Sequence, residues 1–118
     1  MTVAGTYTSG NWLVKEGNER AFVEQWNSVA RWCLDNSKGA RSFRLIQDTK
    51  DPHHFISFGE WDDLEWLTVA RGQPEFLRLF RECQRLCDRF EGSDYTAALI
   101  LPDLDLSRAG GSGSASPG

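Results

Sequence analysis

The chain has 118 residues, which fits one domain with a single hydrophobic core, and its 13 Lys and Arg against 17 Asp and Glu give a formal net charge of −4. This charge gives no support for a general attraction to nucleic acid or to an anionic membrane. Because the sequence also has no uninterrupted apolar run of bilayer length and no signal-peptide pattern, we expect a cytoplasmic protein with no membrane partner.

Aromatic residues and cysteines set the first expectations about the interior. Five Trp and seven Phe are available for a core, an interface or an apolar pocket. The three cysteines, an odd count, indicate a reducing compartment and no disulfide framework. Cys83 and Cys87 are spaced as metal ligands on one helical turn, but they share an apolar stripe with phenylalanines. We therefore interpret both as core residues and expect no metal site.

The first predicted elements are a strand and an amphipathic helix. Residues 6–14 alternate loosely and are rich in strand-forming side chains, with Gly10 indicating a bulge. After residue 18, apolar residues recur at helical spacing, namely Phe22, Trp26, Val29 and Cys33. The helix is expected to end between Asn36 and Gly39, because glycine tolerates the left-handed conformation at a helix C-terminus.

The middle of the chain predicts an antiparallel hairpin. Residues 41–47 alternate as a second strand, residues 53–61 form an aromatic, β-branched run, and the turn-rich link between them contains Asp51-Pro52. One face of the third strand carries His53, Phe55, Ser57, Gly59 and Trp61. Its other face carries apolar and aromatic side chains as well, so both faces are expected to be covered.

Two helices are expected after the hairpin. Asp62 or Asp63 can cap a short helix over residues 64–71, and Pro74 suits the first turn of a long helix that continues to Phe90. Arginines on the far side of the long helix could contact nucleic acid, but acidic residues interleave with them and predict a solvated, ion-paired face instead. The expected pairs are Arg78 with Glu82 and Arg85 with Asp88. No nucleic-acid partner is expected.

The last predicted elements are a fourth strand and a tail. Residues 93–101 alternate with apolar side chains on both faces, and Pro102 ends the strand. Residues 104–118 are rich in Gly and Ser and can bury little, so we expect a disordered tail after a domain that spans residues 1–103.

The order of these elements predicts a fold class. Strand, helix, strand, strand, short helix, helix, strand is the order of a ferredoxin-like α+β fold, a four-stranded antiparallel sheet with its helices on one face. The opposite face stays apolar and aromatic, which predicts association. A two-fold homodimer that stacks two such faces would form a dimeric α/β barrel.

The ordered set of residues also resembles a family, the antibiotic biosynthesis monooxygenase domain, over roughly residues 7–101. The resemblance rests on Gly17, Phe22, Trp26, Gly39, Asp51-Pro52, Phe55, Trp61-Asp62, Pro74 and Phe76. It implies a dimeric α/β barrel with a pocket in each subunit between sheet and helices. In the enzymatic members it implies oxygenation of electron-rich aromatic substrates without a metal or bound flavin, hence no cofactor.

Two branches of this family make different predictions for this chain. Members that degrade haem carry a Trp and a His at the positions of Ala70 and Phe80, so the resemblance disfavours haem as the substrate. Members that oxidise anthrones to quinones resemble the chain at Trp61. The residues at their Asn, Tyr and Arg positions are Ser57, Leu67 and Arg81, and helical phase places the last of these opposite the core stripe.

The candidate residues for a substrate pocket are Trp61, Trp66, Asn11, Ser57, Phe55 and His53. Trp61 lines either the pocket or only the core, and Trp66 is either a lid or an exposed or dimer-contact aromatic. The amide of Asn11 could donate to an oxyanion, and Ser57 could position a substrate oxygen, although both residues have structural interpretations too. His53 shares the face of Trp61 at the opposite end of the strand, where it is a weak candidate for a proton acceptor.

Three functions remain open at this point. The first is a cofactor-independent monooxygenase of a small aromatic or polyketide-like metabolite. The second is a non-catalytic module that binds small molecules in the same pocket. The third is a structural dimerisation unit whose interior is filled by side chains.

Overall fold

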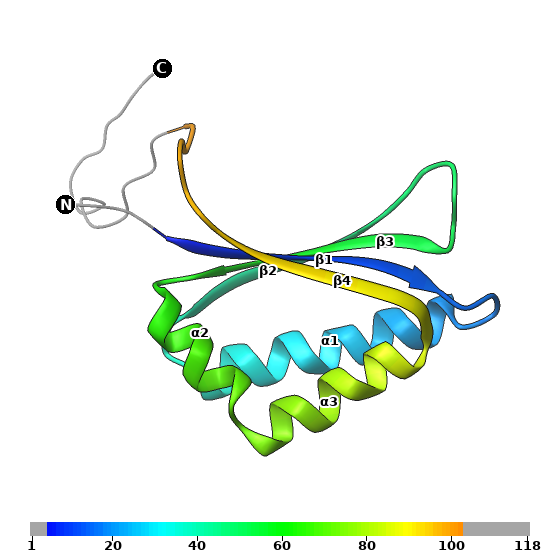
Figure 1. Ribbon diagram of the computed structural model, residues 1–118, viewed down its shortest axis with the longest axis horizontal. Coiled ribbons are helices and arrows are strands. Elements are labelled where there is room, and N and C mark those ends of the chain that lie inside the picture. Colours follow the sequence, from blue (N-terminus) through cyan, green and yellow to red (C-terminus); the bar gives the residue numbers. More distant parts are fainter. Residues whose placement is uncertain (1–4, 103–118) are drawn as a thin grey trace.

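The computed structural model describes residues 5–102, and Figure 1 shows one sheet covered on a single side by helices. The elements in chain order are β1 (Thr6–Val14), α1 (Glu19–Asn36), β2 (Ala40–Gln47), β3 (His54–Trp61), α2 (Leu64–Arg71), α3 (Pro74–Arg85) and β4 (Cys87–Thr96). The strand order is β2-β3-β1-β4 and every pairing is antiparallel. This arrangement confirms the predicted ferredoxin-like α+β fold, including the hairpin of the second and third strands.

The core lies between the sheet and the helices. On β1 the buried side chains alternate with less buried ones, and Trp12 and Val14 are each 1% exposed. The indole of Trp12 packs against Phe22 of α1 and Phe90 of β4, with ring centroids 5.0 and 4.2 Å apart. A ring of this size removes a large apolar area from water, so this cluster is a main source of stability.

The predicted bulge at Gly10 is not present. Pairing of β1 with both neighbours runs unbroken through Gly10, and the only irregularity of described β1 pairing falls between Leu13 and Val14. A Cβ at Gly10 would lie 2.6 Å from the Trp12 indole nitrogen and 2.7 Å from Ser57 Oγ. Gly10 is therefore needed to make room for these two side chains and not to interrupt the ladder.

The helix α1 ends within the predicted range, but Gly39 does not have the predicted role. The helix stops at Asn36 with Ser37 in an extended conformation, and Gly39 does not have a positive φ; of the described glycines, only Gly17 does, at 91°. A Cβ at Gly39 would lie 2.1 Å from Cγ of Trp66. The absence of a side chain at Gly39 thus allows α2 to approach the start of β2. This requirement comes from tertiary packing and could not be inferred from helix-capping rules.

Both predicted starts of the later helices are confirmed. The carboxylate of Asp63 accepts from the backbone N–H of Trp66 at 3.0 Å and so caps α2. Pro74 occupies the first turn of α3, where its missing N–H costs nothing. Together the caps turn the chain twice within a few residues and bring α2 to the end of the sheet (Figure 1).

The predicted boundary between the last helix and strand was wrong. The helix ends at Arg85 and not at Phe90, and Cys87 and Phe90 belong to β4, which continues to Thr96 and not to Leu101. β1 has a free edge along residues 6–14, and pairing with β4 satisfies the backbone groups of that edge. This tertiary pairing outweighs the helical apolar spacing of the local sequence.

The ion pairs of α3 differ from the predicted pairs. Arg78 pairs with Glu75 and Arg85 pairs with Glu82, each three residues apart, in place of the predicted partners. All four side chains are well exposed, so each pair adds little to stability. The helix nevertheless has the predicted solvated, ion-paired face.

The three cysteines are buried and none forms a disulfide in the described part of the chain. Burial raises the pKa of Cys33 and Cys83 to about 12 and the pKa of Cys87 to about 11. These thiols stay protonated at neutral pH and behave as small apolar core residues, as expected.

The predicted tail, residues 104–118, lies outside the described residues, and so does the domain boundary at residue 103. Residues 97–101 follow the end of β4, and Leu99 and Leu101 are strongly exposed. No helix in the range 5–102 is long and apolar enough to cross a membrane.

Candidate functional site

A cavity of about 490 Å³ lies between the inner face of the sheet and the helices. Its floor is formed by alternate residues of β1 and β3 and by the middle of β4, namely Thr8, Gly10, Trp12, Ser57, Gly59, Trp61, Phe90, Gly92, Ser93 and Asp94. The helices add Trp26, Val29, Ala30, Cys33, Leu67, Arg71, Phe76, Leu77 and Phe80. Its volume falls in the range of pockets that hold small organic molecules.

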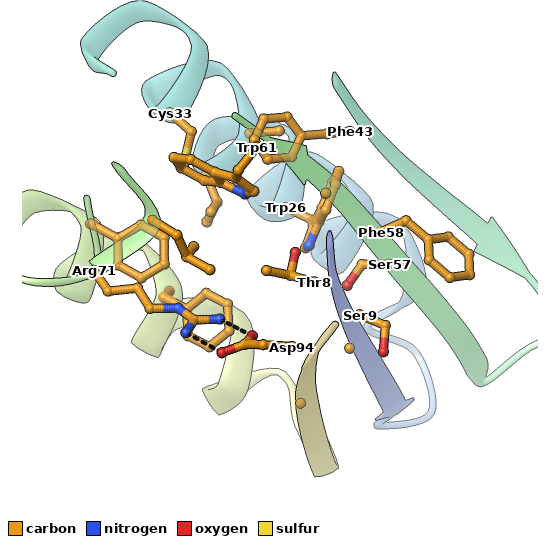
Figure 2. Close-up of a pocket in the computed structure, with 18 of the residues that line it drawn as sticks. Thr8, Ser9, Trp26, Cys33, Phe43, Ser57, Phe58, Trp61, Arg71 and Asp94 are labelled. Atoms are coloured by element: carbon orange, nitrogen blue, oxygen red, sulfur yellow. Dashed lines mark hydrogen bonds and ion pairs between the residues drawn. The ribbon is translucent and has the colours of Figure 1, made fainter. Parts of the chain in front are cut away.

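Aromatic rings form a large part of the cavity wall (Figure 2). Trp61 is 2% exposed, and its ring packs edge-on against Phe43 with centroids 5.8 Å apart. Phe43 in turn contacts Trp26 of α1 at 6.1 Å. A wall of this kind favours a flat aromatic ligand, which can pack against ring faces and edges in an environment that excludes water.

Trp61 is held in this position by both local and tertiary structure. It is the last residue of β3 and pairs with Thr6 of β1 and Ala40 of β2, so its backbone is fixed on both sides. The alternation of β3 directs its side chain toward the helices, as it does for Ser57 and Gly59. A rigid strand end is a precise support for a ligand-contacting group.

The cavity contains few polar groups, and one of them is already engaged. Ser57 Oγ accepts a buried hydrogen bond from Nε1 of Trp12 at 3.0 Å. In contrast, Figure 2 shows the indole nitrogens of Trp26 and Trp61 directed toward the interior of the cavity, with no dashed line from either to another residue drawn. Each indole N–H is a donor only, so these groups are suited to a ligand oxygen.

An ion pair lies at the exposed edge of the cavity. Arg71, at the end of α2, donates from both terminal nitrogens to the carboxylate of Asp94 on β4, at 2.9 and 2.7 Å. The hydrogen bond and the positive charge of Arg71 hold the pKa of Asp94 below its usual range. The two side chains are 43% and 39% exposed, in contrast to the buried Trp61, so they mark the mouth of the cavity.

The structure brings only some of the predicted site residues together. Trp61 and Ser57 both line the cavity, whereas Phe55 is buried in the core beside Phe22, with ring centroids 5.3 Å apart. Trp66 lies against Gly39 at the start of β2 and is not among the lining residues. It is also partly exposed, which is consistent with the interpretation of Trp66 as a surface aromatic.

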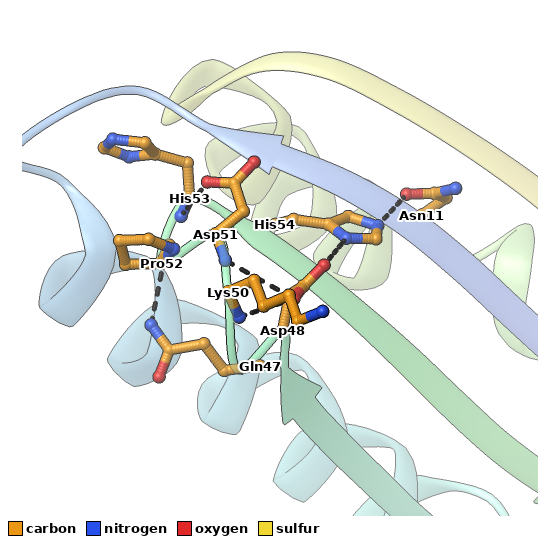
Figure 3. A network of polar contacts seen from close by, with 8 residues as sticks. All are labelled: Asn11, Gln47, Asp48, Lys50, Asp51, Pro52, His53 and His54. Carbon is orange, nitrogen blue, oxygen red and sulfur yellow. Dashed lines mark hydrogen bonds and ion pairs between the residues drawn. The ribbon is translucent and has the colours of Figure 1, made fainter.

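Asn11 lies on the opposite face of the sheet, away from the cavity. Its Oδ1 is 2.8 Å from Nε2 of His54, and Nδ1 of His54 is 2.9 Å from Asp48 Oδ2 (Figure 3). The other carboxylate oxygen of Asp48 accepts from the backbone N–H groups of Lys50 and Asp51, and hydrogen bonds from His54 and Lys50 lower the pKa of Asp48. This network fixes the turn between β2 and β3.

His53 lies at the far end of β3 from Trp61. Its Nδ1 is 2.7 Å from Oε2 of Glu19, the first residue of α1. It is not among the cavity-lining residues. The contact explains how the turn before β3 is held against α1 and does not place His53 near a ligand.

Among the lining residues that were not identified as site candidates from the sequence, the three with polar or charged groups discussed above are Trp26, Arg71 and Asp94. Trp26 was assigned to the apolar stripe of its helix and to the residues that resemble the family, and Arg71 was assigned to the end of a short helix. Asp94 was assigned to a strand whose start was placed six residues too late in the chain. Arg81, the position implied by the resemblance, is exposed and not a lining residue.

Within residues 5–102 no group of three or more His, Cys, Asp or Glu side chains is arranged to hold a metal ion. At the two positions where haem-degrading members carry Trp and His, Ala70 is buried in the core and Phe80 lines the cavity.

The fold and the site define a small ferredoxin-like protein with an aromatic-walled ligand cavity under its sheet. Residues 10–82, more than half of the chain, match the family described as antibiotic biosynthesis monooxygenase. The chain belongs to this family, as its sequence resemblance indicated. The family supports monooxygenase as the general type of activity.

Solved structures with this fold include enzymes and proteins of undescribed activity. One is a mutant of SnoaB from Streptomyces nogalater, a cofactor-independent oxygenase, which is 19% identical to this chain and has a TM-score of 0.78. The alignment covers 84% of this chain and 98% of the SnoaB chain. A conserved protein from Methanosarcina mazei is 18% identical with a TM-score of 0.70, covering 77% and 90%. A protein from Pseudomonas aeruginosa is 17% identical with a TM-score of 0.69, covering 84% and 99%. No curated protein matches the chain.

Proposed function

We propose that the protein is a cofactor-independent monooxygenase that acts on a small aromatic or polyketide-like metabolite held in the cavity. The observation that carries this proposal is the cavity itself, about 490 Å³ in volume, with aromatic walls and two indole N–H groups directed into it. Membership of the family supports the reaction class. The open cavity argues against the third function, a structural dimerisation unit whose interior is filled by side chains.

The proposed reaction uses the substrate itself as the source of electrons. A CH₂ group flanked by aromatic rings and conjugated with a phenolic or keto oxygen loses a proton to solvent water at the open mouth of the cavity, and the resulting anion transfers an electron to O₂. The two radicals combine to a peroxide anion, which takes a proton back from solvent and then loses water to leave a new carbonyl group. One oxygen atom of O₂ therefore enters the product and the other leaves as water.

The chain would contribute stabilisation of the anion and exclusion of water. As the substrate loses its proton, negative charge moves onto its oxygen, which strengthens any hydrogen bond donated to that atom. The N–H groups of Trp61 and Trp26 are the proposed donors, since their nitrogens point into the cavity. The surrounding rings keep bulk water away from the peroxide and strengthen these electrostatic interactions.

Deprotonation would depend mainly on the acidity of the substrate. The lining residues in the described part of the chain include no histidine, and their single carboxylate, Asp94, is held in the ion pair with Arg71. The proposed substrate is therefore one that ionises readily, such as an anthrone or a polycyclic phenol. The need for ready ionisation limits the possible substrates more strictly than the shape of the cavity does.

A binding module remains the second candidate function, and one observation favours it. Ser57 and Leu67 occupy the positions at which the anthrone-oxidising members carry Asn and Tyr, and Ser57 Oγ is engaged with Trp12. These two positions thus offer less hydrogen-bonding capacity than in those members. A protein of this kind would bind aromatic ligands without consuming oxygen.

The homodimer is part of the proposal. The face of the sheet opposite the helices carries exposed apolar side chains from three strands, Ile46 on β2, Phe58 on β3 and Tyr95 on β4. Residues 97–101 do not extend this face as strand, contrary to the expectation for residues 93–101. A second copy stacked on this face would bury these residues and close the barrel.

Oxygen uptake tests the proposal. Purified protein, freed of metal and flavin, is incubated with anthrones and polycyclic phenols while dissolved oxygen and product are measured together. The proposal predicts oxygen uptake equal to the quinone formed and no turnover of haem. Ligand binding without oxygen uptake across the panel would replace the enzyme with the binding module.

A further inference from the structure

Within the described residues, the charged side chains that line the cavity both lie at its mouth. Of the residues that line it, only Arg71 and Asp94 are charged, and they form one two-point ion pair. The other lining groups are aromatic, aliphatic, hydroxyl or backbone groups, together with the protonated thiol of Cys33. A ligand that enters therefore passes one positive and one negative side chain, whose charges are equal in size and opposite in sign. It then meets an uncharged interior.

The pair is positioned by separate elements. Arg71 is the last residue of α2, and Asp94 lies on the edge strand β4, where it pairs with Thr8 of β1. Figure 2 shows the two side chains meeting below the cavity, with Trp61 and Phe43 at its opposite end. Both charges thus lie within reach of one end of a bound ligand, while the indole donors lie further inside.

The interior imposes a strong preference against charge. A carboxylate or ammonium group moved from water into an apolar cavity loses its hydration, and the lining offers no counter-charge except at the mouth. At the mouth, attraction of an anion by Arg71 is offset by repulsion from Asp94, and the reverse holds for a cation. The intact pair gives neither sign of charge a net advantage.

We propose that Arg71 and Asp94 are specificity-determining residues that, by neutralising each other at the mouth, restrict the cavity to uncharged aromatic ligands. This inference rests on the proposed ligand site but not on oxygen chemistry. It adds a constraint to the proposed function: the substrate enters as the neutral phenol or ketone, and it ionises only where the indole N–H groups can donate hydrogen bonds to the oxygen that takes up the negative charge. An acidic metabolite already ionised in water is then a poor substrate.

The test measures charge selectivity directly, with three probes of nearly equal shape: naphthalenemethanol, naphthoate and naphthylmethylammonium. Binding to the wild-type protein and to Asp94→Asn, Arg71→Gln and the double variant is measured by calorimetry at neutral pH. Ratios of affinity between probes within one variant are compared, because a fraction of unfolded protein lowers all three affinities equally and leaves the ratios unchanged.

The expected wild-type order places the alcohol first. Asp94→Asn should raise the affinity for naphthoate relative to the alcohol by about tenfold, a size set by a partly exposed charge, and Arg71→Gln should do the same for the ammonium probe. The double variant should return to the wild-type order. Arg78→Gln is the matched control, because Arg78 forms a similar two-point pair with Glu75 on the exposed side of α3 and should change no ratio.

Two outcomes would overturn the inference. One is a wild-type protein that binds naphthoate or the ammonium probe more tightly than the alcohol; the other is a set of single variants whose ratios stay within about twofold of wild type. If either occurs while oxygen uptake with anthrones is observed, only the charge selectivity is wrong. If no probe binds any variant, the cavity is not a ligand site and the inference falls together with the proposed function.

Discussion

At the scale of single residues, Trp61 tests whether an indole N–H contributes to the reaction. Trp61→Phe keeps an aromatic ring against Phe43 but removes the N–H group directed into the cavity. If that group stabilises the developing oxyanion, the turnover number should fall by about a hundredfold, the usual effect of removing one such donor. Stopped-flow measurement of substrate oxidation checks this result.

The matched control is Trp32→Phe. Trp32 is a partly buried tryptophan of α1 that packs against Phe76, with ring centroids 6.2 Å apart, and it does not line the cavity. Its substitution should change turnover by less than about threefold, since it removes no interaction made in the transition state. Equal losses in the two variants would assign the effect to packing and remove Trp61 from the proposed catalytic role.

The residue scale also shows what the sequence could predict about the site. Alternation along β3 placed Ser57 and Trp61 on the same face of the strand, and the structure has both on the cavity wall. It could not exclude Asn11, because the loose alternation of β1 and the supposed bulge at Gly10 left the face of that strand unassigned. Arg71 and Asp94 are 23 residues apart in the chain, and only the tertiary fold brings them together.

At the scale of elements, the contact between α2 and the start of β2 can be tested by a single methyl group. Gly39→Ala would place a Cβ 2.1 Å from Cγ of Trp66, an atom close to the backbone that cannot swing away freely. The variant should lose about 1–3 kcal/mol of unfolding free energy in urea denaturation, the range for overpacking.

Two further variants isolate the cause. Gly72→Ala, at the other end of α2, meets no atom closer than 3.6 Å and should change stability by less than about 1 kcal/mol. In a Trp66→Ala background, Gly39→Ala should have almost no further cost, because the clashing ring is gone. An undiminished cost in that background would show that the substitution acts on the backbone of residue 39 and not through Trp66.

The boundaries of elements show where local sequence stops being sufficient. The start of β1, the cap at Asp63 and the turn at Pro74 depend on neighbours in sequence, and all three were predicted correctly. The change from helix to strand at Leu86 depends on the free edge of β1, a partner more than seventy residues away. Apolar spacing alone therefore extended α3 five residues too far.

At the scale of the whole molecule, the proposed dimer can be tested on the open face of the sheet. Phe58→Glu places a charge at the centre of the exposed apolar residues and should convert a dimer to a monomer at micromolar concentration, because burying an unpaired carboxylate is costly. Sedimentation velocity measures the result.

Leu34→Glu is the control for the dimer experiment, since Leu34 is similarly exposed but lies on α1, on the helical side of the molecule. It should leave the dimer intact. A wild-type protein that sediments only as a compact monomer, or a Phe58→Glu variant that stays dimeric, would contradict the proposed barrel.

The measurement that most directly tests the central claim is the fate of isotopically labelled oxygen. Purified protein is given an anthrone under ¹⁸O₂ in unlabelled water, and the quinone is analysed by mass spectrometry. Incorporation of one labelled oxygen atom into each product molecule, abolished together with oxygen uptake when protein is omitted, is the predicted result. A product whose new oxygen comes from water, or an anthrone that binds and is recovered unchanged, would contradict the claim that this cavity oxygenates its ligand.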